Sequence, residues 1–161
     1  MFRDRWALLE DPADADGLIA ATGLARPAAL RLLGLAWAYP VARQSLQRLL
    51  AWVAADRTPL TLGVGNAGAL QRHTGPIHRV YATGRWLHVR DPRFHLRVCT
   101  DRIASAWVVK TPSRDGLVTA LELLDAAGAP IVAAGAARWP GQMEPERWRV
   151  LVARLPALLA T

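Results

Sequence analysis

Two histidines beside a predicted turn are the residues whose types and spacing most directly suggest chemistry. His88 and His95 flank Asp91-Pro92, and they share one face of a β-hairpin if Arg90 pairs with Arg93, or if the loop differs by an even number of residues. Facing neutral imidazoles can ligate iron or bind a divalent metal ion. The alternative is a solvated or stacked hairpin face. We favour this alternative, because the alternation of side chains along a strand predicts which residues share a face but does not predict a cavity.

The chain also carries an excess of positive charge. Of its 161 residues, 20 are Lys or Arg and 13 are Asp or Glu, for a net charge of +7, and Lys110 is the only lysine. This excess favours anionic partners such as nucleic acid, phosphate groups or carboxylates. The charge is spread without a run of like residues, which makes nucleic acid an unlikely partner. Arginine in place of lysine, with much alanine, is also typical of a GC-rich genome.

Motifs of several common enzyme classes are missing from the sequence. We find no Ser-His-Asp arrangement with a nucleophile elbow, no glycine-rich phosphate loop and no Cys/His cluster with zinc spacing. Paired carboxylates occur at Asp14 and Asp16 and again at Glu144 and Glu146, where we expect them to complement helix dipoles. The sequence therefore predicts neither a conventional hydrolase nor a conventional transferase.

Cysteine usage and hydropathy indicate the compartment. Cys99 is the only cysteine, so no intrachain disulfide can form, and we see no signal-peptide pattern at the N-terminus. The longest apolar stretches are shorter than the roughly 20 residues that a membrane-spanning helix needs. We therefore expect a cytoplasmic protein that does not associate with a membrane.

Three segments must position these residues. Residues 1–57 are predicted to be helical, with helices from Pro12 to Thr22, from Pro27 to Gly34 and from near Pro40. Residues 58–137 change to a period of two with turn signals, which predicts an antiparallel sheet. Residues 138–161 contain a closing helix that begins near Pro145. We therefore expect one α+β domain, 1–161, with a large antiparallel β-sheet, N-terminal helices and a closing C-terminal helix.

Four segments carry a resemblance to a known family. They read G-N-A-G-A-L-Q-R-H-T-G-P-I (65–77), W-L-H-V-R-D-P-R-F-H-L (86–96), A-W-V-V-K-T-P-S-R-D-G-L-V-T-A-L-E-L-L-D (106–125) and R-W-P-G-Q-M-E-P-E-R-W-R (138–149). In order and spacing they resemble the HemS/HmuS/ShuS haem-trafficking or haemin-degrading proteins, whose fold is shared by the ChuX/HutX carriers. The chain looks like a single copy of the C-terminal of the two similar halves of the long relatives.

The resemblance implies a haem site whose axial ligand has been lost. The family ligand is a histidine in a stretch resembling W-x-x-L-x-D-x-H-x-F-F, and here Trp6, Leu9 and Asp11 match that stretch. Ala13 stands where the histidine belongs. Aromatic residues that would cover the ring are replaced by Ala15 and Asp16, so any bound iron needs another ligand, for which His88 and His95 are candidates.

The resemblance also implies which cations would hold the haem propionates. Arg26 and Arg138 match family arginines with that role. A family lysine corresponds to Thr111, and Lys110 beside it could substitute only by facing the opposite side of the strand. Two further family positions, a tyrosine and a glutamine, correspond to Gly135 and Ala133.

Two functions follow as expectations. The first is cytoplasmic haem binding and trafficking in iron or haem utilisation, with haem b as cofactor and a homodimer as the assembly, because a lone half leaves sheet edges and apolar faces uncovered. The second is a module of the same fold that has lost haem and binds a protein or another anionic ligand through its arginines. Haem degradation, which some long relatives are reported to perform, is disfavoured because the axial histidine is missing.

Overall fold

The protein is described by a computed structural model, which places residues 1–158. Its helices are α1 (Phe2–Ala7), the 3-10 turn η1 (Pro12–Asp14), α2 (Ala15–Ala21), α3 (Arg26–Leu33), α4 (Ser45–Asp56), the 3-10 turn η2 (Thr100–Arg102) and α5 (Glu146–Ala153). The strands are β1 (Ala38–Val41), β2 (Leu60–Asn66), β3 (Ala69–Gly75), β4 (Arg79–Thr83), β5 (Trp86–Asp91), β6 (Phe94–Cys99), β7 (Ser105–Ser113), β8 (Gly116–Leu124) and β9 (Pro130–Ala136).

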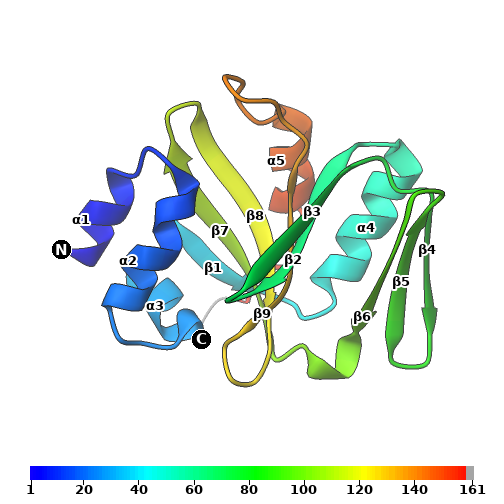
Figure 1. Ribbon diagram of the computed structural model, residues 1–161, viewed down its shortest axis with the longest axis horizontal. Coiled ribbons are helices and arrows are strands. Elements are labelled where there is room, and N and C mark those ends of the chain that lie inside the picture. Colours follow the sequence, from blue (N-terminus) through cyan, green and yellow to red (C-terminus); the bar gives the residue numbers. More distant parts are fainter. Residues whose placement is uncertain (159–161) are drawn as a thin grey trace.

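The strands form two antiparallel sheets. The larger has six strands in the order β1-β7-β8-β9-β2-β3, and the smaller has three in the order β4-β5-β6. Figure 1 shows α1, α2 and α3 at one end of the molecule and the three-stranded sheet at the other, with the six-stranded sheet between them. The predicted α+β class, with a large antiparallel sheet, N-terminal helices and a closing helix, is confirmed.

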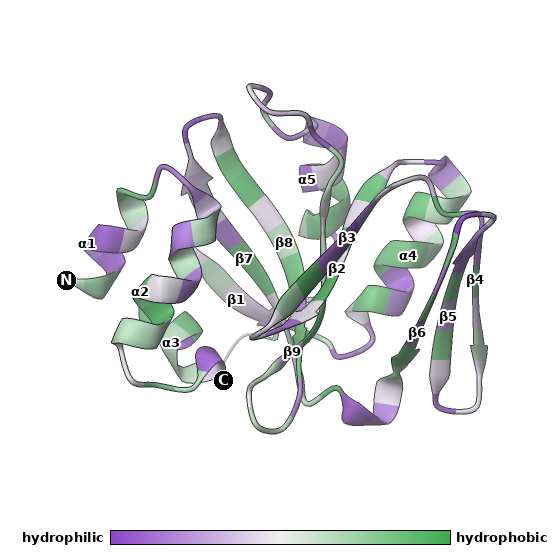
Figure 2. Ribbon diagram, in the orientation of Figure 1, coloured by the Kyte–Doolittle hydropathy of each residue, from purple (hydrophilic) through white to green (hydrophobic). Residues whose placement is uncertain are grey.

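Two hydrophobic cores lie on opposite faces of the six-stranded sheet. One core joins α4, α5 and the inner face of the three-stranded sheet to one side of β7, β8, β9 and β2. The second packs α1, α2 and α3 on Trp107 and Val109 of β7, and its centre is the fully buried Trp6. The indole nitrogen of Trp6 donates a 3.0 Å hydrogen bond to the carbonyl oxygen of Lys110. Figure 2 shows the hydrophobic colouring along β7, β8 and α4.

The segment near Pro40 differs from the prediction. A helix was expected to start there, but the chain forms the edge strand β1, and α4 begins at Ser45. Tyr39 and Val41 have side chains that favour strands, and an edge strand tolerates a proline, which has no N–H to donate. Residues 1–57 are therefore not all helical.

Two other expectations are refined by the structure. The single predicted sheet divides after β3, where Gly75 adopts a φ of +155° and Pro76 follows. The closing helix within 138–161 covers only Glu146–Ala153, and residues 159–161 lie outside the described part of the chain. Among residues 1–158 every helix is too short or too polar to cross a membrane.

Candidate functional site

Four small residues and one glutamate lie together on the side of the six-stranded sheet that also carries α2 and α3. Side chains alternate along a strand, so Ala120 and Glu122 of β8 face away from the core that holds Leu121. The strand pairing places Ala120 beside Gly135 and Glu122 beside Ala133, and Ala133 lies beside Gly63. We call these five positions, Gly63, Ala120, Glu122, Ala133 and Gly135, the floor.

The floor is open above its middle strand. A Cβ atom added at Gly135 would have no other atom within 4 Å, whereas a Cβ at Gly65, at the far end of β2, would lie 2.6 Å from the carbonyl oxygen of Ala69. Gly135 and Ala133, where the family resemblance implies a tyrosine and a glutamine, therefore leave free space.

Arg26 borders the floor but already has carboxylate partners. Its Nε and one terminal nitrogen each donate a 2.8 Å hydrogen bond to the carboxylate of Glu122, and the other terminal nitrogen donates a 2.8 Å bond to Asp16. The side chains of Arg26 and Glu122 are 17% and 15% exposed, while that of Asp16 is 81% exposed. Only the exposed Asp16 can be exchanged easily for a carboxylate of a ligand.

The charge state of Arg26 is secured by these neighbours. Burial by itself lowers the pKa of Arg26, but the hydrogen bonds and negative charges of Glu122 and Asp16 outweigh burial and raise this pKa. Arg26 therefore remains a cation that is suited to an anionic ligand, and Glu122 must be counted as a competing anion in the same place.

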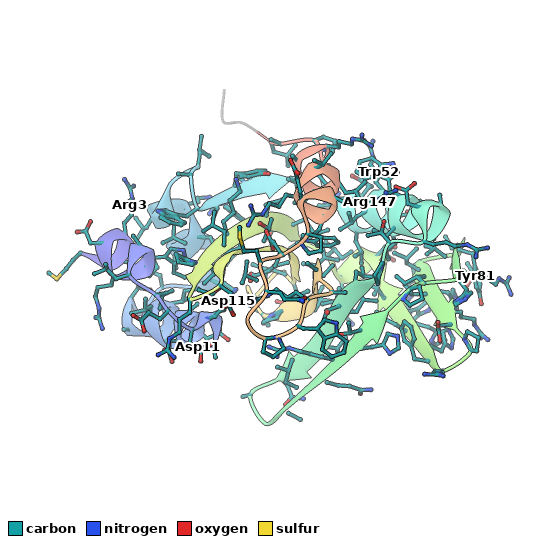
Figure 3. The ribbon with its side chains drawn as sticks, turned by 90° about the horizontal axis from the view of Figure 1, so that it is seen from above. Arg3, Asp11, Trp52, Tyr81, Asp115 and Arg147 are labelled. Atoms are coloured by element: carbon teal, nitrogen blue, oxygen red, sulfur yellow. The ribbon has the colours of Figure 1, made fainter. Side chains whose placement is uncertain are left out.

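Arg138 lies in the loop that follows β9, beside the turn between β7 and β8. Its guanidinium group is 3.8 Å from the carboxylate of Asp115 and donates a 3.2 Å hydrogen bond to the carbonyl oxygen of Gln142. Glu122 holds Arg26 and Asp115 contacts Arg138. These two carboxylates are seven residues apart in the sequence, which is about 23 Å along an extended strand. Figure 3 shows Asp115 beside the loop that follows β9. The two predicted propionate residues are therefore held at well-separated points of the sheet and do not meet at one point.

Lys110 lies on the opposite face of the sheet from Arg26. It pairs with Thr119 of β8, whose hydroxyl group donates a 2.6 Å hydrogen bond to Glu144 on the side of α5. Because Thr119 and Glu122 are separated by an odd number of positions, they face opposite sides. Lys110 and Arg26 therefore do not meet. This agrees with the expectation that Lys110, one position before Thr111, faces the other side of the strand.

The position at which the family resemblance implies an axial histidine is exposed. Ala13 lies in η1, where its backbone N–H donates a 2.9 Å hydrogen bond to the side chain of Asp11. Ala15 is buried in the core beneath the N-terminal helices. A ligand on the floor therefore meets neither an imidazole at residue 13 nor an aromatic cover at residue 15.

The two candidate histidines do share a face, but with a different register. Asp91 pairs with Phe94 and Arg90 with His95, so the loop differs from the Arg90–Arg93 alternative by an even number of residues. His88 and His95 are diagonal neighbours, and Nδ1 of His88 lies 3.0 Å from Nε2 of His95 in a hydrogen bond. This face belongs to the three-stranded sheet and not to the floor.

We expect the pKa of His95 to lie below the usual histidine value of 6.5, so that the side chain stays neutral at a lower pH than an ordinary histidine. Partial desolvation lowers the pKa of His95, and the positive charges of Arg90, His88 and Arg97 lower it further. Neutral His95 therefore stabilises the fold at pH values above 6.5, and this contribution is lost as the pH falls through the lowered pKa. An NMR titration should show a midpoint below 6.5 that rises in Arg90→Gln and stays unchanged in Arg48→Gln. A midpoint at or above 6.5 would contradict this prediction.

Glu144 is a residue whose role the sequence did not indicate. It was expected to complement the dipole of a helix, but its side chain is fully buried and accepts hydrogen bonds from the backbone N–H and the hydroxyl group of Thr119 and from Arg149. Glu146 beside it is exposed in the first turn of α5. The sequence E-P-E around Pro145 does not distinguish the buried glutamate from the exposed one.

A separate hollow lies between α4 and α5, across the sheet from the floor. It has a volume of about 340 Å³ and is lined by Asp56, Glu146, Arg147, Val150, Leu151 and Arg154. An ion pair of 3.1 Å between Arg147 and Asp56 crosses from one helix to the other. Figure 3 shows Arg147 and Trp52 together on this side of the molecule. None of the predicted haem residues lines this hollow.

Comparison with known proteins identifies the family. The model of the haemin-degrading HemS.ChuX domain matches residues 23–155. The hemin transport proteins HmuS of Yersinia pestis and HemS of Yersinia enterocolitica are each 35% identical over 150 residues, which cover 93% of this chain and 44% of each relative. The chain thus spans about half the length of these curated relatives.

Solved structures agree with this result. The apo form of PhuS, a heme-binding protein from Pseudomonas aeruginosa, superposes with a TM-score of 0.94 at 38% identity, covering 98% of this chain and 46% of PhuS. ChuS, a heme-degrading enzyme of Escherichia coli O157:H7, gives a TM-score of 0.92 at 30% identity over 96% of this chain and 46% of ChuS. ChuX, at a TM-score of 0.76 and 6% identity, covers 95% of this chain and 94% of its own, which shows a shared fold. The chain therefore belongs to the haemin-degrading HemS.ChuX domain family.

Proposed function

We propose that this chain binds haem on the floor of the six-stranded sheet and acts in the cytoplasm as a haem carrier. The observation that carries the proposal is the open space over Gly135, in the sheet row that joins it to Ala120. A porphyrin needs a flat apolar surface and cations for its carboxylates, and Arg26 borders this surface through its pair with Glu122. Relatives of the same family are described as hemin transport and heme-binding proteins.

Binding would use the residues of this chain in a particular way. The macrocycle would lie over the small side chains, and one propionate would replace the exposed Asp16 at Arg26 while Glu122 keeps its own two hydrogen bonds. Arg138 would attract the ligand from the loop that follows β9. The iron would be left open or bound by a ligand outside the family position, because Ala13 has no donor side chain. This open iron is why we propose transport and not degradation.

A haemin titration tests the proposed function. We expect a Soret shift whose contribution from the floor saturates at one haemin per chain and is lost in Gly135→Trp, because the indole fills the space above the sheet. Asp16→Asn removes an anion that competes with a propionate, so its haemin affinity should rise about tenfold, equivalent to 1.4 kcal/mol. The control Asp14→Asn changes the charge equally and should leave the affinity unchanged. A spectrum of free haemin at all protein concentrations would refute the proposal.

We propose further that two copies of the chain form a homodimer. The chain covers about half of its long relatives, and β1 and β3 are the edges of the six-stranded sheet. Edge strands are commonly covered by another chain or another element. Equilibrium ultracentrifugation at micromolar concentration should give the mass of a dimer, and a monomer at all concentrations would contradict this proposal.

A second candidate function is favoured by the ion pairs of Arg26. Because Glu122 and Asp16 already neutralise this arginine, the chain could have lost haem and instead bind a partner protein or another anionic ligand. Protein purified from haem-fed cells distinguishes the two functions. Haem absorbance in the purified protein supports the carrier, whereas a colourless protein that also fails the haemin titration supports the interaction module.

A further inference from the structure

The outer face of the three-stranded sheet carries a regular array of cationic and aromatic residues. Pairing between the strands aligns three rows, which are Arg79–Arg90–His95, Tyr81–His88–Arg97 and Thr83–Trp86–Cys99. We call these nine residues the grid. No carboxylate occurs among them, and their inner neighbours pack against α4. Figure 3 shows Tyr81 at the end of the molecule opposite to Arg3 and Asp11, far from the N-terminal helices beside the floor.

The arginines of the grid have no anionic partner within residues 1–158. Salt bridges in that part of the chain involve other arginines and leave Arg79, Arg90 and Arg97 without a carboxylate. Arg79 and Arg90 are directly paired across the strands, where like charges destabilise a sheet. An anionic ligand would relieve this repulsion, so the charge of the grid is complementary to an acidic molecule.

The aromatic rings hold the grid in a fixed arrangement. Tyr81 stacks on His88 with ring centroids 4.6 Å apart, and His88 stacks on His95 at 5.3 Å. The hydroxyl group of Thr83 lies 2.7 Å from Nε2 of His88 and completes this chain of contacts. The guanidinium group of Arg79 lies 5.0 Å from the centre of the Tyr81 ring. The rings and the guanidinium groups are thus ordered before a ligand arrives, which lowers the entropic cost of binding.

The shape and chemistry of the grid select a flat ligand. His88 is buried between the rings of Tyr81 and His95, so within this stack Tyr81 and His95 are the rings that can present their positively polarised edges to a ligand. Such edges attract the negative π-face of an aromatic ligand. Three strands and five residues per strand give a footprint of about 10 by 14 Å. This area is far below the roughly 800 Å² that each partner of a stable protein complex buries, so a small molecule fits the grid better than a protein does.

We propose that the grid is a second binding site, which takes a planar porphyrin dicarboxylate by ring-edge contact and arginine–carboxylate pairs. The site requires no iron ligation, since Nε2 of His95 is already engaged with His88. The proposal shares its ligand class with the proposed function but uses a different surface, and either can fail without the other.

Metal-free protoporphyrin IX is the probe that tests the grid, with binding measured by its fluorescence anisotropy. The measurement uses the Gly135→Trp variant of the full chain, in which the floor is filled. We expect saturable binding that weakens at least tenfold when Arg79, Arg90 and Arg97 are all changed to Gln. Changing Arg5, Arg48 and Arg154 to Gln removes the same charge elsewhere and should leave the affinity unchanged. Circular dichroism checks that each variant is folded.

Three results would overturn the proposal. They are an absence of protoporphyrin binding in Gly135→Trp, binding that the grid variant does not weaken, and equal weakening by the control variant. Adenosine triphosphate, which is also planar and anionic, serves as a competitor. If it binds the grid while protoporphyrin does not, the ligand class is wrong. The grid would also accept haemin, so the floor is measured separately by the haemin titration of the grid variant, with and without Gly135→Trp.

Discussion

Glu144→Ala is expected to lower the free energy of unfolding by about 2–6 kcal/mol, because it leaves two buried donors of Thr119 without an acceptor, at about 1–3 kcal/mol each. The side chain of Glu144 is fully buried, and it accepts hydrogen bonds of 2.7 and 2.6 Å from the backbone and the hydroxyl group of Thr119. Arg149 adds a third bond at 2.9 Å. Alanine would leave these donors without an acceptor and would free the segment before α5 from β8.

Urea unfolding followed by tryptophan fluorescence measures this change. Glu146→Ala is the matched control, because Glu146 is exposed two positions away and contributes only through the helix dipole, about 0.3–1 kcal/mol. If both variants lose the same small amount, the three hydrogen bonds of Glu144 do not hold α5 on the sheet.

Glu122→Ala is expected to have the second large effect. Arg26 is mostly buried, and without Glu122 its guanidinium group would retain only the exposed Asp16 as an anionic partner. Removing one member of such a pair costs about 3–5 kcal/mol, whereas replacing both members with apolar residues is often neutral. We therefore expect Arg26→Met with Glu122→Leu to be more stable than Glu122→Ala alone.

Asp16→Ala provides the control for this experiment. Asp16 is 81% exposed, so its ion pair with Arg26 should contribute less than about 1 kcal/mol. Urea unfolding of the four proteins tests the set, with the unmodified chain as reference. A loss in Asp16→Ala that equals the loss in Glu122→Ala would show that the buried bidentate pair is not what stabilises Arg26.

Much of the local structure was predictable from the sequence. Pro12, Gly23 and Gly34 marked the ends of the early helices, and alternation from residue 58 onward predicted the strands. The same alternation predicted that His88 and His95 share a face. Such signals are local, because helix caps, turn residues and side-chain alternation depend on neighbours within a few positions of the chain.

The candidate site was predictable only in part. Family resemblance predicted haem-site roles for Arg26 and Arg138 and a lost ligand at Ala13, which remain predictions, but it did not indicate that Glu122 holds Arg26 from 96 positions away. The exact pairing of His95 with Arg90 depends on turn geometry, which alternation leaves open in steps of two residues. Glu144 looked like a helix charge because its buried partner, Thr119, lies on a distant strand.

The sequence by itself determined the α+β class, the family and the faces on which its candidate residues lie, since these depend on periodicity and on motifs read along the chain. The tertiary structure alone decided that β9 lies beside β2 and that Arg26 meets Glu122. The physical reason is that distant strands pair in the arrangement that buries the apolar residues of both cores at the same time. No local preference of the backbone carries that information.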